Sequence, residues 1–315
     1  MDRRAHESMS YTVSLVAPAY NEEGLIAEFL NKSIKAFNDN DLKGEILIVN
    51  DGSTDKTEDI LNKYAQKNKL VKVIHNQKNL GLTGASWIGF QAACSDIIVF
   101  LPSDLGSDPQ EDIPILLKPF SEGYDMVVGW KQGKRENFVK QAISRSFNWF
   151  ARVIFQVPYH DLGWIKAFKK EVIHEINLRS DWHRYFTIFA QKQGFKIKEV
   201  KTNYAPRKAG KSKFGTLGLL RIPGAFFDMI SIKMILSFSK KPMFVFGLVG
   251  STFILVGAVI GLYLLVQKLA YGASLIARTP LIFLATVLLL SGIQLFAIGF
   301  LAELIATLRD EVKRK

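Results

Sequence analysis

The chain has 315 residues, a formal net charge of +12 at pH 7 and a single cysteine, and 48% of its residues are hydrophobic. One cysteine excludes a disulfide framework and a cysteine-rich metal cluster, and we expect Cys94 to be a small buried residue of a helix. Many Lys and Arg residues lie between Lys131 and Lys241 without an RNA-binding signature, which favours anionic lipid and phosphate groups over nucleic acid as partners.

The first hundred residues alternate between strand and helix patterns. Short β-branched runs predict strands, and longer amphipathic segments between them predict helices. The predicted order is strand Thr12–Ala17, helix Glu22–Asn38, strand Glu45–Val49, helix Thr57–Lys67, strand Val71–His75, helix Thr83–Ala93 and strand Asp96–Leu101. This alternation predicts an α/β fold with a mostly parallel sheet and helices on both faces.

The middle of the chain continues with less regular elements. The predicted order is strand Asp125–Gly129, a charged loop Lys131–Asn137, helix Phe138–Phe155, helix Tyr185–Gln193, a strand near Lys196–Val200 and a basic loop Arg207–Phe214. The apolar segment Leu217–Phe238 contains charged residues and a proline, which fits helices lying in a membrane interface better than a further span.

Two apolar runs close the chain. Met243–Val266 and Thr279–Ala302 contain no Asp, Glu, Lys or Arg, and each, as a helix, would cross about 30 Å of hydrocarbon. Basic residues precede the first run and follow the second. The residues before Tyr11 contain no apolar run, so the sequence shows no sign of a cleaved signal peptide. We therefore expect an integral membrane protein whose head and both termini are cytoplasmic. The expected domains are a head in residues 1–215, interfacial amphipathic helices in 216–241 and a two-helix transmembrane domain in 242–315.

Polar turns follow three of the predicted strands, at 19–22, 50–53 and 102–104. Ligands bind at the carboxyl ends of parallel strands, so these turns are expected to meet at one crevice. Taken singly, Asp51-Gly52 could be only a turn and Asn21 only a helix cap.

The first two turns carry a resemblance to a known family. Ala17-Pro18-Ala19-Tyr20-Asn21-Glu22-Glu23, followed by Asn50-Asp51-Gly52-Ser53-Thr54-Asp55, resembles the family 2 glycosyltransferases of the Rossmann-like GT-A fold. The resemblance implies that the base and ribose of a nucleotide-sugar donor are held by Pro18, Tyr20, Glu22 and Asp51.

Within that family the chain looks like the polyprenyl- and dolichyl-phosphate glycosyltransferases. The likeness rests on Val127–Lys131, Phe138–Ser144, Asp161–Glu171, Arg207–Phe214 and the two closing runs. It implies that cationic and hydroxyl groups surround the donor diphosphate and the lipid phosphate, whose mutual repulsion they offset. These groups are Lys131, Lys140, Ser144, Arg207, Ser212 and Lys213, all but Lys131 assigned to the lipid phosphate. Taken singly, Lys131 or Lys140 could also be a solvated surface residue.

Two positions depart from the family pattern. The family's Asp-x-Asp is Pro102-Ser103-Asp104 here, and its Asn-x-Gly-Lys-Gly is Asn79-Leu80-Gly81-Leu82-Thr83. The resemblance implies a Mg²⁺ or Mn²⁺ cofactor held by Asp104, which also contributes to donor binding. A single Asp can hold such an ion when phosphates and water complete its shell, so we expect weak metal dependence.

The resulting hypothesis is an inverting transfer of one sugar to polyprenyl (undecaprenyl or dolichyl) phosphate at the cytoplasmic membrane face. Asp104, Lys131, Lys140, Ser144 and Arg207 would be the catalytic residues. The alternative is a membrane-anchored scaffold or regulatory subunit that keeps the fold without turnover, and donor binding separates the two. The sequence leaves open the sugar, UDP or GDP as carrier, the lipid length and whether the chain forms a homo-oligomer.

Overall fold

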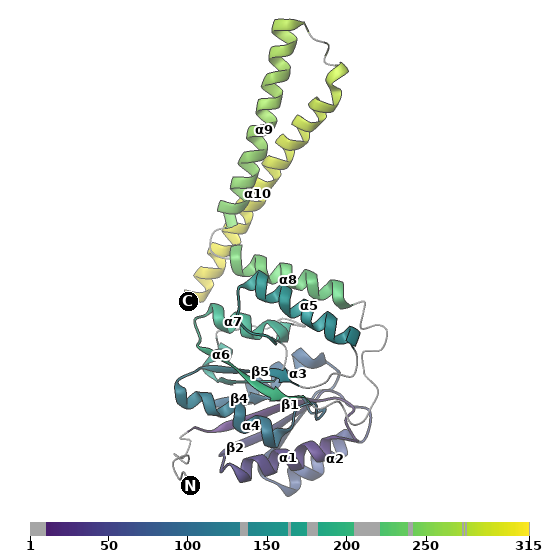
Figure 1. The fold of residues 1–315 in the computed structure, drawn as a ribbon, viewed down its shortest axis with the longest axis vertical. Coiled ribbons are helices and arrows are strands. Elements are labelled where there is room, and N and C mark those ends of the chain that lie inside the picture. Colours follow the sequence, from purple (N-terminus) through teal and green to yellow (C-terminus); the bar gives the residue numbers. More distant parts are fainter. Residues whose placement is uncertain are drawn as a thin grey trace. The chain divides into compact units, whose positions relative to one another are not determined.

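The computed structural model describes residues 11–132, 138–162, 165–174, 182–204, 221–238, 242–272, 274 and 276–314. The chain divides into two compact units, Met1–Gly218 and Leu219–Lys315. The first unit is an α/β head and the second is helical (Figure 1).

The head is built on a seven-stranded sheet with the order β3-β2-β1-β4-β6-β5-β7. Its strands are β1 (Val13–Ala19), β2 (Gly44–Asn50), β3 (Val71–His75), β4 (Ile97–Phe100), β5 (Met126–Gln132), β6 (Lys166–Lys169) and β7 (Ile197–Asn203). β6 is antiparallel to β4 and β5, whereas the other neighbouring strands are parallel. The predicted mostly parallel sheet is therefore confirmed, with one reversed strand, β6, between β4 and β5.

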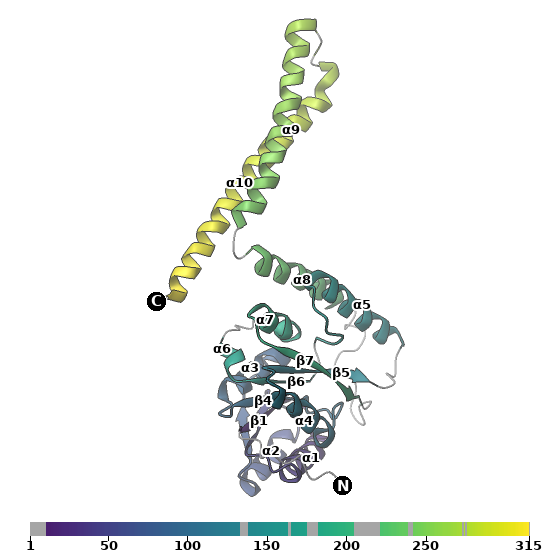
Figure 2. The ribbon, with the colours of Figure 1, turned by 60° about the vertical axis from the view of Figure 1, so that its left-hand side comes forward.

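Helices cover both faces of this sheet. They are α1 (Ile26–Asp39), α2 (Thr57–Lys67), α3 (Gly81–Ala92), α4 (Pro109–Leu117), α5 (Phe138–Phe155), α6 (Glu171–His174) and α7 (Phe186–Lys192), with the short 3₁₀ turns η1 (Lys118–Glu122) and η2 (Trp182–Tyr185). α1 packs against α2 and α4 on one face, while α3 lies on the other face with η2 and α7 (Figure 2).

The main core lies between the sheet and the helices α1, α2 and α4 on one of its faces. β1 is buried along its whole length, as expected for a central strand with helices on both sides. Phe29 and Phe37 of α1 belong to the same buried cluster as Ile113 of α4. On the other face α3 approaches very closely, since a Cβ at Gly89 would lie 2.4 Å from Cγ1 of Val16.

Several predicted elements coincide with the observed ones, namely α2, β3 and α5. α4 and β6 were not predicted, because α4 is short and contains a proline and β6 is a four-residue strand with a lysine at each end. The predicted loop at 131–137 is wrong at its start, where Lys131 and Gln132 extend β5, and residues 133–137 lie outside the described residues.

The prediction for Cys94 is wrong. α3 ends at Ala92, and Cys94 is exposed in the connection to β4. Its backbone N–H donates to Glu45 Oε1 at 2.9 Å, and its thiol donates to the Ala92 carbonyl oxygen at 3.5 Å.

The second unit contains α8 (Arg221–Phe238), α9 (Pro242–Tyr271), η4 (Ile276–Arg278) and α10 (Thr279–Arg314). α9 and α10 pack along each other as an antiparallel hairpin (Figure 2). Both are long and apolar enough to cross a membrane, with mean hydropathies of 2.4 and 2.5 over their most apolar stretches. Gly250 and Gly292 bring the two backbones together, because a Cβ at Gly250 would lie 2.8 Å from Gly292 O.

Candidate active site

The turns after β1 and β2 are joined by hydrogen bonds. Asn21 has a positive φ of 52°, which Asn tolerates better than most residues. Its Oδ1 accepts from the Thr54 N–H at 2.8 Å, and its own N–H donates to Ser53 Oγ at 3.0 Å. Glu22, which is buried, donates its backbone N–H to Thr57 Oγ1 at 2.8 Å.

The segment after β4 joins the same edge of the sheet. The Ser103 hydroxyl, which is buried, donates to the carbonyl of Pro18 at 2.8 Å. Three stretches far apart in sequence therefore meet at the carboxyl ends of β1, β2 and β4, as predicted. This is the edge at which α/β sheets bind ligands.

Asp51 is buried at this edge, with 3% of its surface exposed. Its Oδ1 accepts from Asn76 Nδ2 and from the Leu80 N–H, each at 2.9 Å. Gly52 has a φ of +68°, and a Cβ there would lie 2.9 Å from the Lys78 carbonyl carbon. The second turn is thus closely packed against the 76–80 segment. Of the other predicted donor residues, Pro18 is buried and Tyr20 is half-buried.

Asp104 lies in the turn after β4, where its Oδ1 accepts from the Gly106 N–H at 3.1 Å. Leu105, next to it, has a positive φ of 55°, an unfavourable conformation for a branched residue. Asp108 does not join Asp104, because its carboxylate caps α4 through the Gln110 N–H and pairs with Lys32. Asp104 and Asp108 therefore do not form a pair of carboxylates at this turn.

Asp104 fits a divalent cation that takes most of its ligands from a bound diphosphate and from water. Within the described residues no group of three or more His, Cys, Asp or Glu could hold a metal ion. A single carboxylate at a strand end is compatible with Mg²⁺ or Mn²⁺ only when diphosphate oxygens and water complete the coordination shell.

Of the residues predicted to surround the phosphates, only Lys131 has a described side chain. Lys131 lies near the end of β5 in register with Thr202, and its Nζ lies 5.0 Å from the centroid of the Tyr204 ring. Lys140 and Ser144 belong to α5, but the positions of their side chains lie outside the described part of the chain. Arg207, Ser212 and Lys213 lie wholly outside the described residues.

One charged residue at this edge was not predicted. Lys166 of β6 pairs with Phe100, the last residue of β4, and only 3% of its surface is exposed. Burial lowers its pKa to about 8, and the negative charge of Asp161 opposes that shift. Both residues lie in the Asp161–Glu171 segment, so the resemblance marked the segment but did not single out the lysine.

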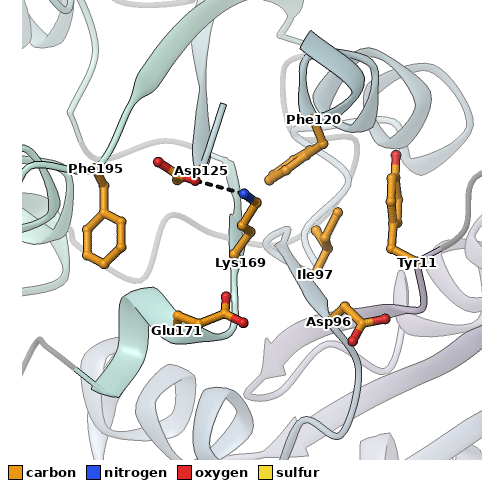
Figure 3. Close-up of a pocket in the computed structure, with 8 residues that line it drawn as sticks. All are labelled: Tyr11, Asp96, Ile97, Phe120, Asp125, Lys169, Glu171 and Phe195. Carbon is orange, nitrogen blue, oxygen red and sulfur yellow. Dashed lines mark hydrogen bonds and ion pairs between the residues drawn. The ribbon is translucent and has the colours of Figure 1, made fainter. Parts of the chain in front are cut away.

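A groove of about 460 Å³ lies at the other edge of the sheet (Figure 3). Its lining includes Ile97, the first residue of β4, and Lys169, the last residue of β6. Lys169 pairs with Asp125 at 2.8 Å, and Asp96 accepts from the Thr12 N–H at 2.8 Å. Because these charges are satisfied within the protein and lie at the amino end of β4, we do not assign the nucleotide site to this groove.

Comparison with protein families identifies the class. Residues 14–175, just over half of the chain, match the model described as glycosyl transferase family 2, and the chain belongs to that family. The head is therefore a glycosyltransferase domain, and the matched range contains β2 to β6 and all of β1 except Val13, with the turns after β1, β2 and β4.

Individual relatives are similar along nearly the whole chain. Undecaprenyl-phosphate 4-deoxy-4-formamido-L-arabinose transferase of Pseudomonas paraeruginosa is 28% identical over 306 residues, covering 96% of this chain and 87% of that protein. Dodecaprenyl-phosphate galacturonate synthase of Rhizobium johnstonii is 28% identical over 303 residues, covering 94% and 88%. Both alignments are too long to be confined to the head.

Solved structures share the fold of the head. Glucosyl-3-phosphoglycerate synthase from Mycobacterium tuberculosis, crystallised with Mn²⁺, UDP and phosphoglyceric acid, superposes with a TM-score of 0.56 at 22% identity. The match covers 70% of this chain and 78% of that one. The predicted GT-A fold is confirmed.

Proposed function

We propose that this protein transfers one sugar from a nucleotide-sugar donor to polyprenyl phosphate at a membrane surface. The observation that carries the proposal is the similarity to undecaprenyl-phosphate and dodecaprenyl-phosphate sugar transferases over 94–96% of the chain. That span includes the nucleotide-site turns and the apolar hairpin together. A water-soluble donor and a lipid acceptor require both parts.

The proposed transfer is a single displacement that needs no general base from the protein. A phosphate oxygen of the acceptor forms a bond to the anomeric carbon of the sugar, the bond from that carbon to the donor diphosphate breaks, and the nucleoside diphosphate leaves. A single in-line displacement inverts the anomeric centre. Because the acceptor phosphate is already ionised near neutral pH, no general base is needed, and catalysis consists of positioning and charge stabilisation.

Different residues are assigned to the nucleoside, the donor diphosphate and the lipid phosphate. Pro18, Tyr20, Glu22 and Asp51 hold the nucleoside at the ends of β1 and β2. Lys131 faces the donor diphosphate, and the lipid phosphate is held by Lys140, Ser144, Arg207, Ser212 and Lys213. The cationic groups offset the repulsion between the two anions.

A divalent cation would be held by Asp104 together with the donor diphosphate, and when bound it neutralises charge on the leaving group. With only one carboxylate we expect a shallow dependence of activity on Mg²⁺ or Mn²⁺. Pro102→Asp restores the second carboxylate and should lower the metal concentration for half-maximal activity by about tenfold. Activity titrated from chelator upward measures this. Full activity in chelator for both proteins would show that Asp104 is not a metal ligand.

We also propose that the head and both termini lie on the cytoplasmic side. The charge flanking the two apolar helices supports this orientation. Likewise, we propose the division into a head (1–215), interfacial helices (216–241) and a transmembrane hairpin (242–315). α8 supplies the helix in the second of these segments.

The test is an assay of membranes containing the protein, incubated with a panel of UDP- and GDP-sugars and with polyprenyl phosphate. We expect one donor to give a lipid-linked monosaccharide, identified by mass spectrometry, together with the free nucleoside diphosphate. A protein that binds a nucleotide-sugar without forming product, or binds none, would support the scaffold alternative instead. Family membership and the similar transferases do not favour that alternative.

A further inference from the structure

In the turn after β4, buried residues flank Asp104 on both sides. Ser103, Leu105 and Ser107 are buried, whereas Asp104 is half-buried. Asp104 is the proposed protein ligand for a divalent cation, and Pro102 supplies no second carboxylate. The conformation of this turn therefore decides whether that single carboxylate lies where it can bind the ion.

The backbone of the turn is strained at its middle. Leu105 has a φ of 55°, which a branched residue adopts only at a cost in free energy. Its side chain belongs to the main buried cluster of the head. The Asp104 carboxylate reaches across Leu105, since its Oδ1 accepts from the Gly106 N–H at 3.1 Å. A strained conformation of this kind persists only where the surrounding structure holds it.

Two buried hydroxyl groups hold the turn, one on each side of Asp104. Ser103 Oγ donates to the carbonyl oxygen of Pro18 in β1 at 2.8 Å. Ser107 Oγ donates to Oδ2 of Asp112 in α4 at 2.5 Å. The first hydrogen bond ends on the main chain, which any residue at position 18 would supply. The second depends on the side chain of Asp112.

Asp112 is placed to accept this hydrogen bond and is buried, with 1% of its surface exposed. Its backbone N–H donates to the Asp108 carbonyl at 2.9 Å in the first turn of α4, so its position follows from the start of that helix. Its Oδ1 has no hydrogen-bond partner within the described residues. An apolar side chain would avoid burying that unpaired oxygen, which is unfavourable for folding. What the carboxyl group provides in return is the hydrogen bond to Ser107.

We propose that Asp112 is a positioning residue for the divalent cation: through Ser107 it holds the turn after β4 so that the Asp104 carboxylate lies where it can bind the ion together with the donor diphosphate. This inference rests on the part of the proposed function that assigns the cation to Asp104. Asp112 itself touches neither the ion nor the substrate in this role.

Three substitutions test the hydrogen bond from both ends. Ser107→Ala removes the donor, and Asp112→Leu removes the acceptor at similar size. Asp112→Asn removes the charge but keeps an oxygen that can accept from Ser107. Glu111→Gln is the matched control, because Glu111 is the exposed neighbouring acid of α4 and the amide can still accept from Asn203.

The measurement is a calorimetric titration of Mn²⁺ into the full-length protein in detergent, saturated with UDP or GDP, whichever it binds. We expect Ser107→Ala and Asp112→Leu to weaken Mn²⁺ binding by at least about fivefold, and Asp112→Asn and Glu111→Gln to stay within about twofold of wild type. Affinity for the nucleotide without metal should stay within about twofold in every variant, because the nucleoside is assigned to other turns. Asp104→Asn should weaken Mn²⁺ binding by at least about tenfold.

A double variant separates positioning from simple destabilisation. Each apolar single variant leaves a buried polar group without its partner, so its melting temperature should fall. In Ser107→Ala/Asp112→Leu neither polar group remains, and the melting temperature should recover towards that of the wild type. Mn²⁺ binding should stay weak, because the turn is still not held on this side of Asp104.

Several outcomes would overturn the inference. These are wild-type Mn²⁺ affinity in Ser107→Ala, Asp112→Asn as weak as a folded Asp112→Leu, or a double variant that regains Mn²⁺ affinity along with its melting temperature. If Asp104→Asn binds Mn²⁺ as the wild type does, the assignment of the cation to Asp104 is wrong, and this inference with it. Weak binding in Asp104→Asn with unchanged binding in Ser107→Ala overturns the inference alone.

Discussion

One of the two Asp51 carboxylate oxygens, Oδ1, accepts hydrogen bonds from the protein itself. Oδ1 accepts hydrogen bonds from Asn76 and Leu80 of the 76–80 segment, and Asp51 is almost fully buried within the second turn. An aspartate so placed can shape the nucleoside site and bind the nucleoside as well. Substitution must therefore distinguish loss of the carboxylate from loss of the loop.

Asp51→Asn makes that distinction, because the amide keeps one acceptor oxygen for Asn76 and Leu80. We expect donor affinity to fall at least about tenfold, about 1.4 kcal/mol, since the second oxygen becomes a donor group. Calorimetric titration with the cognate nucleotide-sugar measures the change. Asp59→Asn, in the exposed first turn of α2, is the control and should bind as the wild type does. Unchanged affinity in Asp51→Asn would remove this residue from the nucleotide site.

Asp112 carries a buried charge that should make the head less stable at high pH. Burial raises its pKa from 3.8 to about 6, although the Ser107 hydroxyl donates to Oδ2 and partly opposes the shift. Its Oδ1 has no hydrogen-bond partner within the described residues. A carboxyl group whose pKa is raised in the folded state favours folding when protonated, so its contribution is lost as pH rises from about 4 to 6.

Asp112→Asn should remove this pH dependence. Above pH 6 the variant avoids an ionised buried carboxylate and should be more stable than the wild type by about 1–3 kcal/mol, an advantage that shrinks towards pH 4. Thermal melts at pH 5 and pH 8 measure the difference. Asp39→Asn, at the exposed end of α1, should show no such trend. Equal destabilisation of Asp112→Asn at both pH values would mean that packing rather than charge determines its effect.

Among the elements, the α9–α10 hairpin depends on small residues at the contact. A Cβ at Gly292 would lie 2.7 Å from Gly250 O, and one at Gly257 would lie 3.0 Å from Ala285 O. In lipid, where the hydrophobic effect does not drive helices together, such close backbone packing is a principal source of helix association.

Gly292→Leu should therefore weaken the hairpin. The added side chain must displace backbone atoms of α9, which costs about 1–3 kcal/mol or more. Thermal unfolding of the purified protein in detergent, followed by circular dichroism, should show a lower transition for the helical unit. The matched control is Gly261→Leu on α9, because a Cβ there meets nothing within 4 Å. If both variants melt alike, the glycine contact does not stabilise the hairpin.

For the whole molecule, the two compact units suggest that the first binds the donor and the second gives access to the lipid acceptor. The turns proposed to form the nucleotide site lie in Met1–Gly218, and both apolar helices lie in Leu219–Lys315. The donor site should therefore form without the second unit, whereas efficient access to a lipid acceptor should not.

A fragment ending at Gly218 tests this division. We expect donor affinity within about threefold of the full chain, a difference under about 1 kcal/mol. Turnover with long-chain polyprenyl phosphate in vesicles should fall at least about tenfold, because the membrane anchor no longer raises the local acceptor concentration. A water-soluble short-chain acceptor should restore part of that loss. A fragment that binds no donor would show that the second unit is needed to form the nucleotide site.

The sequence determined those features that local patterns encode. Alternating strand and helix runs specified α2, β3 and α5 within their observed bounds, and uncharged runs of membrane-spanning length specified α9 and α10. The turn motifs identified the family before any tertiary contact was known. Each of these signals is local, because hydrophobic periodicity and turn chemistry depend on neighbouring residues.

Only the tertiary structure decided which side chains meet at the carboxyl edge of the sheet, where the site is proposed. β6 has four residues with a lysine at each end, so nothing local predicts a central antiparallel strand, and it becomes one because β4 and β5 supply its hydrogen bonds. The sequence did not single out Lys166, and long-range packing buries it beside Phe100. Glu199 meets residues 160 and 161 across about forty positions of chain, and a contact at that separation is fixed by strand register rather than by local sequence.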